Sequence, residues 1–447
     1  MPQQRATELP QGAQKGVIAA LNRPIVVLFV LQLMGGMMLS PHRTFYPVYV
    51  SELGHSALLI STMATAGSLM GLIASLVGGS LSDSLGRKWT LFLGQIGFLL
   101  GSLVFLTRSP GWIAFLWAVS GFGMGLHTLG GQSYLIDAAH TSYLGILAAF
   151  YNWGYTLGGT LSSPIAGLLL DRWNFPVFGL TLATFAVATL AVNGFLLPKS
   201  PAARATSAGR GPARATPSGV PLGASGGGTP PPASRGGALP RALFGYADIA
   251  RRPTVALLVL LRFLPTLYWG MAVVLMPLLL NATGATKTTI ALYATVSQVC
   301  AALAQLAIGR AIDRLGPRWP ALVAFAALVL SILGTGILPG QTWSVFLFGT
   351  AGTAAAWSLS TLLPSLVAHV TVQQERGRVL GWVHLWWNLA MMIGSLLGGY
   401  LFERSAGLPF LVTGAVNILS VALVVVFFQV AARAKGKSLP AQALPTP

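Results

Sequence analysis

The chain has 447 residues, of which 54% are hydrophobic and only 8% are charged, and its mean hydropathy is +0.71. Soluble domains carry about 25% charged residues, so this composition excludes a soluble globular protein. The formal net charge is +18. In a membrane protein basic residues report topology, so we expect no nucleic-acid partner. The single cysteine, Cys300, excludes an intramolecular disulfide.

Apolar runs long enough to cross a bilayer, which takes about 20 residues each, recur along the whole chain. The first 22 residues are polar and lack the pattern of a signal peptide, so we expect the first span to direct its own insertion. Breaks at glycine, proline and charged residues predict twelve spans, at 24–50, 56–80, 88–107, 111–137, 142–170, 176–197, 254–280, 287–311, 319–338, 342–369, 379–402 and 409–432. The predicted fold class is therefore an all-α integral membrane protein with twelve transmembrane helices.

Residues 198–253, between the sixth and seventh spans, are rich in Pro, Gly, Ala, Ser and Arg, a composition that cannot bury a core. This segment predicts a flexible linker between two six-helix bundles. The expected organisation is an N-terminal tail (1–22), a first bundle (23–197), the linker (198–253), a second bundle (254–432) and a C-terminal tail (433–447).

Lysine and arginine are distributed unequally between the two sides of the predicted spans. One side has the linker and Arg5, Lys15, Arg23, Arg87, Lys88, Arg310, Arg314, Arg318, Arg376, Arg378, Arg433, Lys435 and Lys437. The other side has Arg43, Arg108, Arg172, Lys287 and Arg404. The positive-inside bias predicts that both termini and the linker are cytoplasmic, in a multi-pass protein of the cell membrane.

The two predicted bundles repeat each other in sequence. One alignment places "PVYVSELG" (47–54) on "PLLLNATG" (277–284), and "GSLSDSLGRKW" (79–89) on "GRAIDRLGPRW" (309–319), with no gap between the two matches. Six spans return the chain to the same side, so the halves are expected to be parallel copies about an axis along the membrane normal. Such pseudosymmetry suits a protein that rocks one half against the other.

The stretch "GGSLSDSLGRKWTL" (78–91) resembles the signature of the major facilitator superfamily, Gly-x-Leu-x-Asp-x-x-Gly-Arg-Lys. The resemblance implies two pseudosymmetric six-helix bundles around a cavity that opens alternately to either side. It also implies a charge relay of Asp83 and Arg87 with an acid at the cytoplasmic end of span four, a place that Asp137 occupies. The predicted conformational latch consists of Gly79, Asp83, Gly86, Arg87, Lys88 and Asp137, together with Asp313 and Gly316 of the degraded second copy.

Two arginines lie within predicted spans, where an ionisable group raises the insertion free energy by roughly 2.5–3.5 kcal/mol at a helix centre. Arg43 lies near the outer third of the first span, and Arg262 lies eight residues into the seventh, aligned with Gln32. Each arginine either extends its side chain to the nearer surface or faces the substrate cavity. If both face the cavity, an anionic or strongly hydrogen-bonding substrate follows.

Further cavity candidates come from polar and aromatic residues at matched depths. His127 lies near the middle of span four, where it either packs as a neutral imidazole or contacts substrate or a proton; its counterpart region in span ten is Trp357 and Ser358. Placing residues 144–159 on residues 380–395 aligns Asn152 with Asn388. Asn152 follows Phe150 and Tyr151, and Asn388 follows Trp386 and Trp387. These matched aromatic pairs predict either a substrate clamp or symmetric helix packing.

Motifs for other chemistry are missing from the sequence, which has no phosphate-binding loop and no His, Cys or Asp cluster at metal-ligand spacing. We therefore expect no cofactor, no metal and no enzyme activity. The expected partners are a small-molecule substrate, the lipid bilayer and a coupling proton or ion, and the chain is expected to be a monomer.

The expected function is secondary active transport of a small organic solute by alternating access. A partial antiporter motif around Pro164, together with the aromatic pairs, favours efflux of a drug-like or amphipathic compound. Arg43 and Arg262, and Trp117 at the place of the usual antiporter arginine, favour uptake of a sugar or organic anion. A non-transporting membrane sensor is a further alternative.

Overall fold

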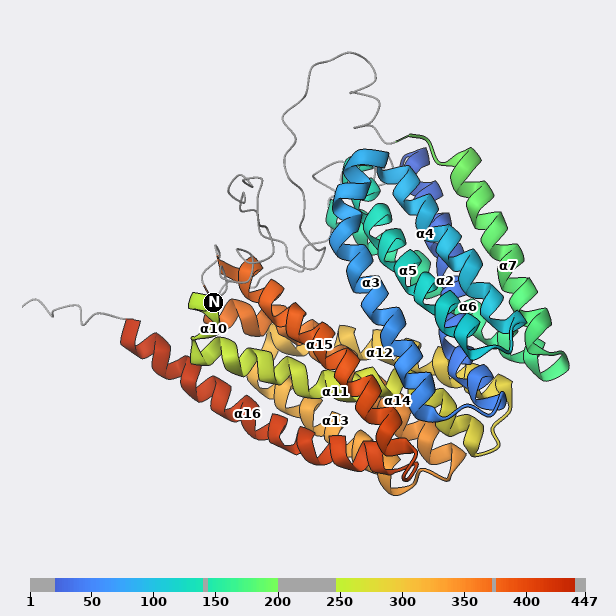
Figure 1. The fold of residues 1–447 in the computed structure, drawn as a ribbon. Coiled ribbons are helices and arrows are strands. Elements are labelled where there is room, and N and C mark those ends of the chain that lie inside the picture. Colours follow the sequence, from blue (N-terminus) through green and yellow to red (C-terminus); the bar gives the residue numbers. More distant parts are fainter. Residues whose placement is uncertain (1–20, 140–143, 200–246, 372–374, 439–447) are drawn as a thin grey trace, which may run out of the picture. The chain divides into compact units, whose positions relative to one another are not determined.

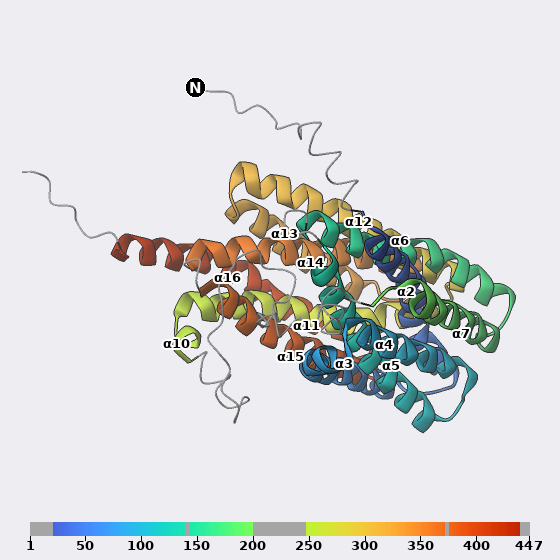
Figure 2. The same ribbon diagram turned by 90° about the horizontal axis from the view of Figure 1, so that it is seen from above.

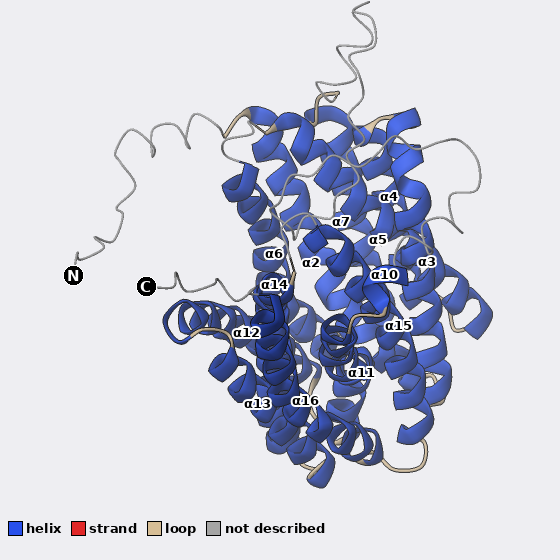
Figure 3. Cartoon of the chain, turned by 90° about the vertical axis from the view of Figure 1, so that its left-hand side faces the viewer, coloured by secondary structure: helices blue, strands red, loops and turns tan. Residues whose placement is uncertain are grey.

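The computed structural model describes residues 21–139, 144–199, 247–371 and 375–438, so most of the predicted linker and tails lies outside the described residues (Figure 1). The described part is helical and contains no strand (Figure 3). The long helices are α2 (Arg23–Glu52), α3 (Ala57–Leu85), α4 (Arg87–Ser102), α5 (Pro110–Ala138), α6 (Leu144–Arg172), α7 (Phe175–Ala191), α11 (Pro253–Ala282), α12 (Lys287–Leu315), α13 (Arg318–Ile337), α14 (Thr342–Val370), α15 (Arg376–Phe402) and α16 (Leu408–Ser438).

These twelve helices match the twelve predicted spans within a few residues at most ends. The clearest differences are that α3, α12 and α16 continue beyond the predicted ends at 80, 311 and 432. In addition, α4 and α7 end before 107 and 197, where a 3-10 turn (Leu103–Leu106) and a π turn (Val192–Leu196) follow them. Among the described helices, eleven are long and apolar enough to cross a membrane. The twelfth, α6, has 29 residues and includes the polar side chains of Asn152, Ser162 and Ser163.

Local sequence signals set several helix boundaries. Proline occupies the first turn of α5 at Pro110, where a missing backbone N–H leaves no hydrogen bond unmade. Asn174 and Thr286 cap α7 and α12, because each side-chain oxygen accepts a hydrogen bond from a backbone N–H three residues later, at 3.1 Å. Such caps satisfy donors that would otherwise be unpaired at a helix end.

The chain divides into two compact units, Met1–Arg43 with Ala66–Thr216, and Thr44–Thr65 with Pro217–Pro447. The second unit therefore includes the ends of α2 and α3 that join through Gly54, which the sequence assigns to the first bundle. Contacts within this unit account for the grouping. Glu52 pairs with Lys287, and the Leu58 backbone N–H donates to Glu403 Oε1 at 3.0 Å.

Small residues let helices approach closely within each unit. In the first unit α4 and α5 lie side by side (Figures 1 and 2), and a Cβ added at Gly123 would lie 2.7 Å from the Cα of Gly97. Gly158 of α6 meets the backbone of Leu33 in the same way. In the second unit Gly394 of α15 meets the backbone of Leu267. Close packing of this kind stabilises helix pairs in a lipid environment.

Candidate functional site

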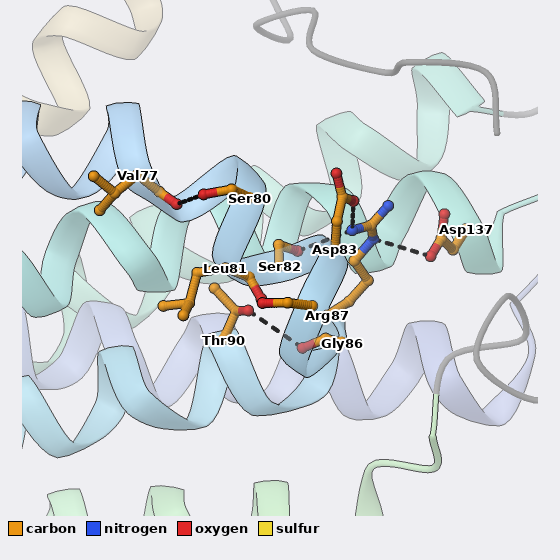
Figure 4. Close-up of polar contacts among 10 residues, drawn as sticks. Val77, Ser80, Leu81, Ser82, Asp83, Gly86, Arg87, Thr90 and Asp137 are labelled. Carbon is orange, nitrogen blue, oxygen red and sulfur yellow. Dashed lines mark hydrogen bonds and ion pairs between the residues drawn. The ribbon is translucent and has the colours of Figure 1, made fainter. Parts of the chain in front are cut away.

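The first copy of the signature lies where α3 gives way to α4 (Figure 4). We expected a connection between spans, but α3 continues through Ser82 and Asp83 and ends only at Leu85. The chain reverses at Gly86, whose φ of 90° lies in the region that favours glycine. The signature is therefore the last turn of one helix, a glycine joint and the first turn of the next.

Arg87, the first residue of α4, lies between two carboxylates (Figure 4). Its guanidinium pairs with Asp83 on α3, and its Nε lies 3.4 Å from Asp137 Oδ2 on α5. The side chain of Asp83 is 72% exposed, whereas that of Asp137 is 17% exposed. Three helices thus meet at one guanidinium, and a role of this cluster as a conformational latch stays a prediction.

The two other members of the first copy have different surroundings. Lys88 Nζ donates to the carbonyl oxygens of Gly194 at 2.9 Å and Leu197 at 2.6 Å, in and just after the π turn η3 (Val192–Leu196) that extends α7. These carbonyls lie at a helix end, where backbone acceptors need partners. At Gly79 an added Cβ would meet no atom of the described residues within 4 Å, so no close helix contact in that part of the chain requires this glycine.

The second copy keeps the glycine joint without the ion-pair cluster. Gly316 has a φ of 72°, but Asp313 forms no ion pair with any residue that the structure describes. Two other acids of the second unit pair with arginines near the start of α15. Asp248 pairs with Arg378 at 2.8 Å, and Glu375, which precedes α15, accepts two hydrogen bonds from Arg252, at 2.6 and 2.9 Å. The Arg252 guanidinium holds the pKa of Glu375 below its ordinary value.

A buried polar pair lies in the first unit. His127 on α5 and Gln32 on α2 are 4% and 7% exposed, and His127 Nε2 lies 2.8 Å from Gln32 Oε1. The imidazole lies against the ring of Phe98 on α4, with centroids 4.9 Å apart. His127 is therefore the predicted polar candidate of this unit whose side chain is enclosed between helices, whereas Arg43 and Asn152 are exposed.

Arg262 on α11 is the corresponding polar centre of the second unit. Its Nη1 donates to Ser360 Oγ on α14 at 2.9 Å, and its Cζ lies 5.7 Å from the ring centroid of Trp387 on α15. Its buried Nε has no hydrogen-bond partner, and Arg262 forms no ion pair within the described ranges. The cavity that it borders inside this unit measures about 10 Å³, which is too small for an organic solute.

The two centres occupy equivalent places in the repeat. Gln32 and Arg262 coincide when residues 47–54 are placed on residues 277–284, and each bonds the fourth long helix of its half. The expected counterpart of His127, Ser358, is buried and donates to the carbonyl of Ala354 at 2.9 Å. The serine that contacts Arg262 is Ser360, which the sequence alignment missed by two positions.

The remaining predicted cavity residues do not join either centre through a hydrogen bond or ring contact in the described part of the chain. Arg43 and Asn152 are exposed, and Asn388 Nδ2 donates to the His384 carbonyl one turn earlier. Trp357 is 37% exposed and packs edge-to-face against Trp269, with centroids 5.9 Å apart. Of the aromatic residues in the predicted clamp, Trp387 lies beside Arg262, and the clamp itself stays a prediction.

Comparison with known proteins gives a consistent family assignment. A family model described as Major Facilitator Superfamily matches residues 28–268 and 258–447. The chain is 25% identical over 413 residues to a gallate transporter from Pseudomonas putida, covering 88% of this chain and 90% of that protein. It is 28% identical over 165 residues to the inner membrane transport protein YnfM of Escherichia coli, covering 36% of this chain and 39% of that protein.

Solved structures share the fold at low sequence identity. A D-xylose–proton symporter gives a TM-score of 0.64 at 15% identity, covering 91% of this chain and 97% of the other. A nucleoside transporter gives a TM-score of 0.70 at 12% identity, covering 91% of this chain and 100% of the other. Identities this low support likeness of fold alone.

Proposed function

The chain belongs to the Major Facilitator Superfamily, and we propose that within this family of transporters it carries a small organic anion. It is a multi-pass membrane transporter rather than an enzyme, since the family and its relatives are transporters. The observation that carries the proposal is the guanidinium of Arg262, a charge within a predicted span that no described carboxylate balances.

The chemistry around Arg262 favours an aromatic carboxylate. A guanidinium presents a planar set of donors that matches a carboxylate, and the adjacent ring of Trp387 offers an apolar face for stacking. The named substrate of one relative, gallate, combines these features. A lipophilic cation is disfavoured because the guanidinium repels it, which weighs against efflux of cationic drugs.

We propose that the solute is transported into the cell and that both termini are cytoplasmic.

The test is a thermal-shift measurement on the purified full chain with gallate, its uncharged methyl ester, myo-inositol and a lipophilic cation. Gallate at 100 times its Kd is expected to stabilise the folded protein by about 2.7 kcal/mol. A hydrogen bond to a charged group contributes about 1.5–3 kcal/mol to the binding free energy. Arg262→Ala removes this contribution and is therefore expected to weaken gallate binding roughly tenfold to 150-fold.

Arg318→Ala is the matched control, because Arg318 also lies near a tryptophan ring, at 6.0 Å, but at the start of α13. This variant should bind gallate like the wild type. Equal stabilisation by the methyl ester, or unchanged gallate binding by Arg262→Ala, would refute the proposal. Uptake into reconstituted vesicles then separates a carrier from a sensor, which would bind the solute without moving it, and gives the direction of transport.

A further inference from the structure

The distribution of carboxylates limits how this chain can use a proton gradient. Of its nine Asp and Glu residues, Glu8 lies outside the described residues and before the first predicted span. The eight that the structure describes lie in terminal turns, at caps or in the short helix α10 (Ala247–Ala250): Glu52, Asp83, Asp137, Asp171, Asp248, Asp313, Glu375 and Glu403. A proton site within the membrane must therefore use a side chain of another type.

Histidine is the remaining side chain whose ordinary pKa, about 6.5, suits reversible protonation near neutral pH. The histidines within long helices differ in their surroundings. The His384 ring lies 5.2 Å from the ring of Trp387, which also contacts Arg262, and the fixed positive charge of that arginine opposes a second one nearby. His42 Nε2 lies 3.0 Å from the Gly101 carbonyl oxygen, and its ring stacks on Trp117 at 5.0 Å. His369 lies in the last turn of α14.

His127 differs from these because one of its ring nitrogens, Nδ1, is buried without a hydrogen-bond partner among the described residues. Gln32 Oε1 can only accept a hydrogen bond, so His127 Nε2 must carry the hydrogen of the 2.8 Å contact. Nδ1 then holds a free lone pair. It is buried and has no hydrogen-bond partner among the described residues. A buried, unpaired acceptor on a titratable ring requires an explanation beyond packing.

The groups that face His127 carry no charge in the described structure. On α2 these are Gln32 and Gly35, and on α4 they are Gly94 and the Phe98 ring. The titratable groups that α6 brings to this region are two phenols, Tyr151 beside Gln32 and Tyr155, which packs against the cluster that contains Phe98. On α3, Gly71 and Ala74 pack against α5 at Gly125. Arg43 lies eleven residues beyond Gln32, about 16 Å along α2.

We infer that His127 is the proton-binding group that couples solute transport to a proton gradient, an inference that rests on the proposed transport function. The proton adds to Nδ1, which converts the neutral ring to an imidazolium, and its departure from the same nitrogen restores the neutral ring. An imidazolium enclosed as His127 is here would be strongly unfavourable, so the proton binds when water reaches the ring. Protonation thereby depends on the conformation of the transporter.

The experiment uses the full chain in liposomes that contain a pH-sensitive dye, with gallate as the solute. Wild-type protein is expected to acidify the lumen as gallate enters and to exchange labelled for unlabelled gallate. His127→Gln keeps a donor toward Gln32 but cannot titrate. It is expected to retain exchange within about twofold and to lose at least tenfold in proton movement per gallate. His127→Asn is the second variant if His127→Gln does not fold.

His42→Gln is the matched control, because His42 is equally buried on a neighbouring helix. This variant should retain both gallate exchange and proton movement. Wild-type exchange without acidification would overturn the inference and leave the transport proposal standing. Proton movement by His127→Gln at the wild-type ratio, or loss of exchange in both folded variants, would also overturn it.

Discussion

The contacts of single residues separate the two acids of the signature cluster. Arg87 bridges Asp83 on the surface and Asp137 in a more enclosed position. Water and salt screen an exposed ion pair, so exposed pairs contribute about 0–1 kcal/mol. The enclosed pair is screened less. If the cluster holds one conformation in place, Asp137 contributes more to its stability than Asp83 does.

We therefore expect Asp137→Asn to reduce the transport rate more than Asp83→Asn does. For Asp83→Asn the change should be below about fivefold, the equivalent of 1 kcal/mol. Initial rates in reconstituted vesicles measure both, with thermal stability and membrane expression of each variant as controls. Equal rates for Asp137→Asn and the wild type would argue against a latch.

At the scale of helices, equivalent glycines determine how the first and fifth long helices of each half cross. Gly158 and Gly394 coincide in the alignment that pairs Asn152 with Asn388. Each faces the backbone of the opposing helix, at Leu33 and Leu267. A backbone cannot move aside as a flexible side chain does. Any side chain at these positions must separate the two helices.

Gly158→Ala is accordingly expected to destabilise the protein by about 1–3 kcal/mol, the usual effect of overpacking. Gly309→Ala serves as the control, because a Cβ at Gly309 meets nothing within 4 Å and alanine favours a helix by up to about 1 kcal/mol. Thermal unfolding in detergent compares the two. A Gly158→Ala protein as stable as the Gly309→Ala protein would contradict the close crossing.

The positions of the helices along the chain were predictable because each needs a long apolar run. Which residues of a helix face its neighbours was not predictable. The spans were predicted from apolar length and from breaks at glycine, proline and charged residues. The ends of α3 and α12 were missed because polar residues such as Asp83 and Asp313 continue the helix until a glycine reverses the chain. The partner of Arg262 depends on helix rotation. Ser358 and Ser360 differ by two positions, about 200° around a helix, and only packing determines which serine faces α11.

For the whole molecule, the uneven distribution of basic residues predicts one orientation in the membrane. Cys300 is the only cysteine, so a Cys300→Ala protein is a clean background for thiol labelling. An impermeant reagent applied to intact cells is expected to modify Ser405→Cys, in the turn after α15, and to modify Ser234→Cys in the linker only after permeabilisation. The reverse pattern would contradict cytoplasmic termini.

Within the described ranges, four backbone positions have positive φ, and they form two pairs in the repeat, Gly54 with Gly284 and Gly86 with Gly316. In the same alignment, position 32 is glutamine in one half and its counterpart at 262 is arginine. The two halves thus share their glycine joints and differ at a polar position that, at Arg262, we propose to contact the solute. A fold that keeps its glycine joints can change its polar residues at positions such as 32 and 262. Substitutions there would change the solute that is transported without altering the joints.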